Sequence, residues 1–128
     1  MASILVVDDE ESITMGVERS LTTEGHQVIC AVNGKEALKI IASQTIDLVI
    51  ADILMPEMDG YELILKLRKH PNPPKIIAIS GGSYKQDGKE LLHAAKLMRV
   101  DRIMPKPLDS SVINAAVMEV LGAVSTTT

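Results

Sequence analysis

Aromatic residues are almost missing from this sequence, whose 128 residues include two tyrosines and neither phenylalanine nor tryptophan. Since 46% of the residues are hydrophobic, the core must be built from aliphatic side chains and methionine. The one cysteine, Cys30, has no partner for an internal disulfide, and its place in an apolar run predicts a small core residue. The net charge is −4, and lysine and arginine do not cluster, which argues against direct nucleic-acid binding.

Long hydrophobic runs are also missing. Asp8 interrupts the apolar N-terminal run after a few residues, too early for a signal peptide or a membrane span. We therefore expect a cytoplasmic protein with no membrane-embedded segment. The length suits one domain, which we place at residues 1–122, followed by a flexible tail at residues 123–128.

Short apolar runs alternate with segments that have a helical pattern. The runs lie at residues 4–7, 28–31, 48–51, 75–80 and 102–104, and an unbroken apolar run is typical of a strand buried on both faces. A helical segment follows each run. The first should end at Gly25, the fourth should cover about residues 88–98, and the last should begin with an N-cap at Asp109 and Ser110. Five strands alternating with five helices predict an α/β fold with a doubly wound parallel sheet.

Five polar residues end or follow these predicted strands: Asp8, Asp9, Asp52, Ser80 and Lys106. Right-handed crossovers place every strand-to-helix loop of such a sheet on the same edge, so we expect the five side chains to lie close together. Each residue alone also has a structural explanation. An aspartate pair suits a helix N-terminus, an aspartate after a strand opens a turn, and serine and lysine are ordinary loop residues.

The charges of this group indicate its chemistry. Three carboxylates about 5 Å apart repel one another by roughly 3 kcal/mol per pair at an effective dielectric near 20, so a cation or bound protons must offset them. Asp8, Asp9 and Asp52 offer only oxygen ligands, which favours Mg²⁺. Such a site can accept a phosphoryl group when the metal and Lys106 hold its oxygens, Ser80 donates to a third oxygen and an aspartate is the nucleophile.

Four motifs match a known family. The segment VVDDE at residues 6–10, the segment DILMPEMDG at residues 52–60, Ser80 and the segment PKP at residues 105–107 resemble the response-regulator receiver domain of two-component signalling. The resemblance covers the chain from Ser3 to about Leu121. It implies a flavodoxin-like receiver fold, a five-stranded parallel sheet in the order 2-1-3-4-5 with five helices.

The resemblance also implies roles for single residues. Asp52 resembles the phosphoacceptor, Ser80 the switch hydroxyl and Lys106 the lysine that pairs with the acyl phosphate. The phosphoryl donor would be a sensor histidine kinase or a phosphotransfer protein, and the output partner or output domain is not named by the sequence. A domain of this family is not an enzyme for external substrates, because it catalyses only its own phosphorylation and dephosphorylation.

The family likeness extends to the metal ligands. Asp9 resembles the direct ligand of Mg²⁺ and Asp8 its partner through water. Asp52 and the main-chain carbonyl of Leu54 would complete the protein ligands.

Two positions depart from the family pattern. Ile103 stands where the family usually has Tyr or Phe, the aromatic side chain that swings inward when the domain switches. Arg99 stands where a glycine commonly ends the fourth helix, so we expect another kind of cap there or modest backbone strain.

Three other functions fit the sequence less well. A flavin-binding module would need a Ser/Thr/Gly-rich loop after the first strand, where this chain has the acidic run at residues 8–11. A phosphohydrolase with an aspartyl nucleophile usually has a second aspartate two positions on, where this chain has Leu54. A pseudo-receiver that docks partners without phosphorylation would not need the acidic pair, Asp52 and Lys106.

Overall fold

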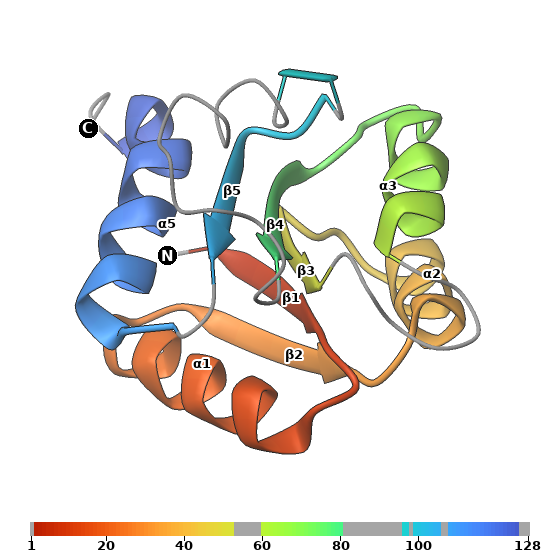
Figure 1. Ribbon diagram of the computed structural model, residues 1–128. Helices are drawn as coiled ribbons and strands as arrows, with labels where there is room; N and C mark the ends of the chain where they lie inside the picture. The colour runs from red at the N-terminus through yellow and green to blue at the C-terminus, as the bar shows by residue number, and fades with distance from the viewer. Residues whose placement is uncertain (1, 53–59, 81–95, 98, 106–107, 126–128) are drawn as a thin grey trace.

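The computed structural model describes residues 2–52, 60–80, 96–97, 99–105 and 108–125 (Figure 1), apart from the side chains of Tyr61, Ser80 and residues 123–125. Five parallel strands form one sheet in the order β2-β1-β3-β4-β5, which confirms the predicted class and topology. The strands are β1 (Ser3–Val7), β2 (Gln27–Ala31), β3 (Leu48–Asp52), β4 (Lys75–Ser80) and β5 (Arg102–Pro105).

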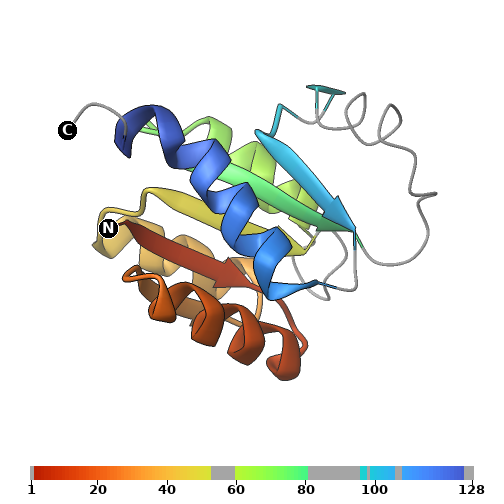
Figure 2. The same cartoon turned by 90° about the vertical axis from the view of Figure 1, so that its left-hand side faces the viewer.

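Two layers of helices cover the sheet. The helices are α1 (Glu11–Thr23), α2 (Gly34–Ser43), α3 (Gly60–Arg68) and α5 (Ser110–Ser125). Helices α1 and α5 lie on one face of the sheet, while α2 and α3 lie on the other (Figures 1 and 2). The predicted helix at about residues 88–98 falls mostly outside the described residues, although Lys96 and Leu97 are helical. The division at residue 122 stays a prediction, and α5 continues past it to Ser125.

The strands are apolar on both faces because both faces are covered. In β1, Ile4 and Val6 pack into the core layer beneath α1 and α5, whereas Leu5 and Val7 pack into the layer beneath α2 and α3. All five residues of β3 are buried. An unbroken apolar run therefore predicted these central strands correctly, because neither face needs polar side chains.

Polar side chains begin two of the helices. The Asn33 side chain accepts a hydrogen bond from the Glu36 N–H at 2.8 Å, which caps α2. Asp109 Oδ1 accepts hydrogen bonds from the N–H (2.8 Å) and the hydroxyl (2.6 Å) of Ser111, and these bonds lower the pKa of the Asp109 carboxyl. The Asp109 carbonyl accepts the N–H of Ile113 at 2.9 Å. The predicted N-cap of the last helix is thus confirmed.

Two residues at helix ends have left-handed backbone conformations. Gly25 follows α1 with φ +94°, and its N–H donates to the Thr22 carbonyl at 3.0 Å, as expected for a glycine that ends a helix. Arg99 has φ +58°, and its N–H lies 3.3 Å from the Lys96 carbonyl. A side chain in this conformation costs roughly 1–2 kcal/mol. The modest strain expected where the family usually has glycine is therefore present.

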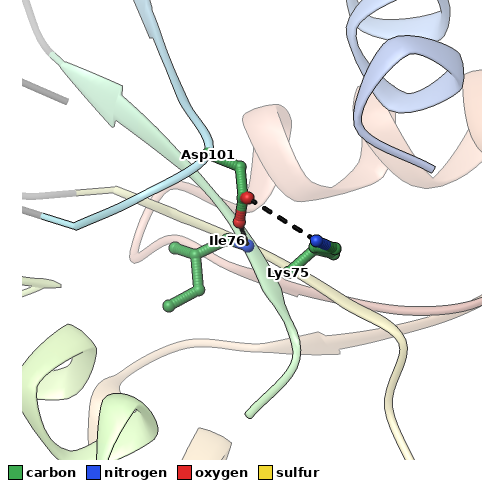
Figure 3. Close-up of polar contacts among 3 residues, drawn as sticks. All are labelled: Lys75, Ile76 and Asp101. Atoms are coloured by element: carbon green, nitrogen blue, oxygen red, sulfur yellow. Dashed lines mark hydrogen bonds and ion pairs between the residues drawn. The ribbon is translucent and has the colours of Figure 1, made fainter. Parts of the chain in front are cut away.

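Two aspartates tie strands together at the amino edge of the sheet, the edge where its parallel strands begin. Asp101 directly precedes β5, and its Oδ2 accepts the Ile76 N–H at 2.8 Å (Figure 3). The main-chain N–H of Asp101 donates to the Ile76 carbonyl, also at 2.8 Å. Lys75 Nζ lies 4.0 Å from Asp101 Oδ1. Asp47 precedes β3 and repeats the arrangement with Ser3, again with both hydrogen bonds at 2.8 Å. Each pair joins neighbouring strands through a ring of two hydrogen bonds.

A histidine occupies the corresponding position before β2. His26 Nδ1 accepts the Ala2 N–H at 3.2 Å, and the next residue, Gln27, donates its N–H to the Ala2 carbonyl at 2.9 Å. Burial and the positive charge of the amino terminus lower the pKa of His26, against an opposing contribution from Glu24. An unprotonated Nδ1 is what this hydrogen bond requires.

Candidate functional site

Asp8 lies at the end of β1 with no exposed surface. Its N–H donates to the carbonyl of Ala31, the last residue of β2, at 3.1 Å. Its Oδ1 accepts the Glu10 N–H at 2.9 Å, the local turn that aspartate commonly makes with the residue two positions on. Main chain and side chain are therefore both held, and the carboxylate has a defined orientation.

Asp52 is the last residue of β3 and only 4% exposed. The preceding residue, Ala51, is the partner of Val7 in the register of β1 and β3. Because these two strands are parallel neighbours, the residues that follow the pair, Asp8 and Asp52, emerge side by side at the carboxyl edge of the sheet. On its other side, Asp52 pairs with Ile79 of β4.

Three carboxylates converge at this edge. Oxygen atoms of Asp8, Glu10 and Asp52 all lie within 4.8 Å of one another. At that spacing each pair of charges repels by roughly 3 kcal/mol at an effective dielectric near 20. An all-oxygen ligand set with this charge fits a hard divalent cation that keeps several waters, such as Mg²⁺.

Glu10 is the residue of this group that the sequence reasoning did not select. It is exposed and forms the N-cap position of α1, where its carbonyl accepts the N–H groups of Ile13 and Thr14 at 3.0 and 3.2 Å. The signal was present in the acidic run at residues 8–11. Which of those four carboxylates turn toward Asp52 depends on the backbone at the start of α1, and the sequence does not reveal it.

The two other predicted metal ligands are not placed in this group. Asp9 is exposed and does not belong to the set of three converging carboxylates, so its role as a ligand stays a prediction. Leu54 lies outside the described residues.

The predicted hydroxyl and lysine are located only through their strands. Ser80 is the last residue of β4 and pairs with Pro105 in the register of β4 and β5, which puts its main chain at the carboxyl edge with Asp8 and Asp52. Its side chain and all of Lys106 lie outside what the structure describes. Their roles stay predictions.

Ile103 is 7% exposed and packs in the core layer beneath α2 and α3. Its branched side chain therefore occupies the interior already. The chain thus has a packed aliphatic side chain at the position where the family usually has the aromatic ring.

Comparisons with known proteins point to one family. A model of the response regulator receiver domain matches residues 4–118. A probable transcriptional regulator of Cyanidium caldarium is 34% identical over 125 residues, covering 96% of this chain and 47% of its own length. A sensor kinase of Brucella abortus is 35% identical over 122 residues, covering 94% of this chain and 12% of the kinase. The chain thus spans half or less of the length of these relatives.

A solved structure agrees with these matches. The crystal structure of a putative response regulator from Chloroflexus aurantiacus superimposes with a TM-score of 0.83 and 27% identity, covering 94% of this chain and 98% of that one. Within the part of the chain described here, no helix is long and apolar enough to cross a membrane.

Proposed function

Because the chain belongs to the response regulator receiver domains, the phosphoacceptor modules of two-component signalling, we propose that Asp52 is the residue that accepts the phosphoryl group. The observation that carries this proposal is the position of Asp52, which is 4% exposed at the end of a central strand and within 4.8 Å of the Asp8 and Glu10 carboxylates. In open α/β sheets, ligands bind in the crevice at the carboxyl ends of the strands, which is the edge where Asp52 lies.

The proposed reaction is a transfer between two residues. A carboxylate oxygen of Asp52 attacks the phosphorus of a phosphohistidine, the phosphorus–nitrogen bond breaks, and the released imidazole takes up a proton. The new bond is the phosphorus–oxygen bond of an aspartyl phosphate. Lys106 and Ser80 are proposed to hold the oxygens of the transferred group, as the resemblance implies.

The carboxylates set the charge of the site. A bound Mg²⁺ would supply positive charge that offsets the carboxylates and the phosphoryl oxygens. Asp8, Glu10 and Asp52 form the oxygen-only group suited to it, and Asp9 with the carbonyl of Leu54 are the further ligands that the family resemblance suggests. The Glu10 N–H orients the Asp8 carboxylate through a hydrogen bond of 2.9 Å.

The partners follow from the family. The proposed phosphoryl donor is a sensor histidine kinase or a phosphotransfer protein in the cytoplasm, and the output is a partner or a further domain. One relative is a probable transcriptional regulator, which supports a connection to an output, and another is a sensor kinase, which supports a connection to a kinase. The only reactions proposed for this domain are its own phosphorylation and dephosphorylation.

Mass spectrometry of the intact protein tests the assignment. Acetyl phosphate in the presence of Mg²⁺ should add one phosphoryl group to the wild type and none to Asp52→Asn, since an amide is nearly isosteric but a poor nucleophile. Without Mg²⁺ the adduct should be much reduced. Asp47→Asn, the same change at the amino edge, should be phosphorylated like the wild type. A full adduct on Asp52→Asn would show that another residue is the phosphoacceptor.

A further inference from the structure

Glu10 has a carboxylate to which neither the family resemblance nor the start of α1 gives a role. It stands at the N-cap position of α1, yet its side chain makes no capping hydrogen bond. The residues preferred at an N-cap are Asn, Asp, Ser and Thr, whose short side chains reach the N–H groups of the first turn. The helix therefore does not account for a glutamate here, but the convergence of its carboxylate with those of Asp8 and Asp52 points to the metal group.

The main chain of Glu10 is held on both sides. Its N–H donates to Asp8 Oδ1 at 2.9 Å, and its carbonyl accepts the N–H groups of Ile13 and Thr14 at 3.0 and 3.2 Å. Asp8 and Asp52 are buried, whereas Glu10 is exposed. The group thus combines two buried carboxylates with one longer side chain that projects from a fixed main chain and has room to adjust its position.

The spacing of the three oxygens bears on the size of the ion. At the outer limit of 4.8 Å, an ion in the plane of three equally spaced oxygens would lie about 2.8 Å from each. Calcium binds oxygen ligands at about 2.3–2.6 Å, whereas magnesium demands about 2.0–2.1 Å. From that limit the oxygens must close in by roughly 0.2 Å to reach Ca²⁺, against roughly 0.7 Å to reach Mg²⁺.

The number of ligands separates the two ions as well. Asp8, Glu10 and Asp52 supply three carboxylates, and the family resemblance adds Asp9 and the carbonyl of Leu54. Magnesium usually binds one or two carboxylates and keeps several waters, whereas calcium takes about six to eight oxygens in a flexible geometry. An additional carboxylate should therefore raise the affinity for Ca²⁺ more than the affinity for Mg²⁺.

We propose that Glu10 sets the cation selectivity of this site: its carboxylate binds a larger ion such as Ca²⁺ directly and acts on Mg²⁺ only through water. This inference rests on the proposed Mg²⁺ site beside Asp52 and adds a second cation to it. The two cations then compete for one position, and their relative concentrations decide which of them occupies it.

NMR titrations with CaCl₂ and with MgCl₂ measure this selectivity. Both cations should shift the main-chain amides of residues 8–10, and the wild type should bind Ca²⁺ at least as tightly as Mg²⁺. Glu10→Gln should weaken Ca²⁺ binding on the order of hundredfold but Mg²⁺ binding only about tenfold, so the ratio of the two affinities changes about tenfold. Glu11→Gln, the same change at the neighbouring exposed residue, should keep the ratio of the wild type.

Glu10→Asp separates direct binding from the effect of charge alone. It keeps the charge but shortens the side chain by one methylene, so the ratio should change in the same direction as in Glu10→Gln. A wild-type ratio in both variants would overturn the proposed selectivity while leaving the Mg²⁺ site in place. A wild type in which neither cation shifts residues 8–10 would overturn the metal site and this inference together, and the mass of Asp52→Asn tests the phosphoacceptor separately.

Discussion

The two edges of the sheet use the same side chain in opposite ways. At the amino edge, Asp47 and Asp101 each accept a main-chain N–H at 2.8 Å from a neighbouring strand, so each carboxylate has a partner that stabilises its charge. At the carboxyl edge, oxygens of Asp8, Glu10 and Asp52 crowd within 4.8 Å. One edge holds strands together, while the other keeps a concentration of negative charge that folding alone does not need.

This difference shows where charge repulsion lowers the stability of the fold. Carboxylates that accept hydrogen bonds from main-chain N–H groups favour the folded state, whereas carboxylates that face one another oppose it until a cation arrives. Substitutions of the same kind at the two edges should therefore have opposite effects on the free energy of unfolding.

Metal affinity should change most. Asp9→Ala, which removes the proposed direct ligand, should weaken Mg²⁺ binding roughly hundredfold, since an ionic contact of about 3 kcal/mol is lost. Asp8→Ala and Glu10→Gln should cost on the order of tenfold, as expected for ligands that act through water or support the others. Titration of Mg²⁺ followed by NMR measures the affinity.

The control for this series is at the other edge. Asp47→Ala should bind Mg²⁺ with the affinity of the wild type. If Asp9→Ala also leaves the affinity unchanged while Glu10→Gln lowers it strongly, Glu10 takes the place of Asp9 as the direct ligand. Such a result would favour the three converging carboxylates of the structure over the family assignment.

The free energy of unfolding should fall when an aspartate of the amino edge loses its carboxylate. Asp101→Ala leaves the Ile76 N–H without the acceptor that now lies at 2.8 Å, and a buried donor without a partner costs about 1–3 kcal/mol. Lys75→Ala should cost less than about 1 kcal/mol, because its ion pair with Asp101 is 4.0 Å long and exposed. Urea unfolding measures both, and an equal loss in the two variants would assign the effect to the ion pair.

A substitution at the carboxyl edge should change the free energy of unfolding in the opposite direction. In the presence of a chelator, Asp8→Asn should raise the free energy of unfolding by about 1 kcal/mol, because one of the crowded charges is removed and the amide oxygen still accepts the Glu10 N–H. Addition of Mg²⁺ should stabilise the wild type more than this variant. A loss of stability in Asp8→Asn under chelating conditions would show that the crowding of carboxylates is not costly.

The sequence predicts those parts of this contrast that follow from local patterns or from topology, and it misses contacts between residues that are far apart in sequence. The five strands were predicted because continuous apolar runs follow directly from burial on two faces, and Asp8 and Asp52 were brought together by topology alone. In the sequence, Asp47 and Asp101 look like ordinary loop aspartates. Their structural role was not predictable, because the residues that donate to them lie 44 and 25 positions away in sequence. Glu10 required the local backbone at the start of α1.

The smallest predicted effect concerns His26, the third residue of the amino edge. Its pKa is lowered in the folded protein, chiefly by burial, so at pH below about 6.5 the unfolded chain binds more protons than the folded one. The stability that the Ala2–His26 hydrogen bond provides is therefore complete above that pH and is lost as the pH falls. The loss should stay below about 1 kcal/mol, since the residue is only partly buried. Urea unfolding at about pH 7.5 and about pH 5.5 should show wild type and His26→Ala converging in acid, and a difference that widens toward acid would mean that protonated His26 is favoured in the fold.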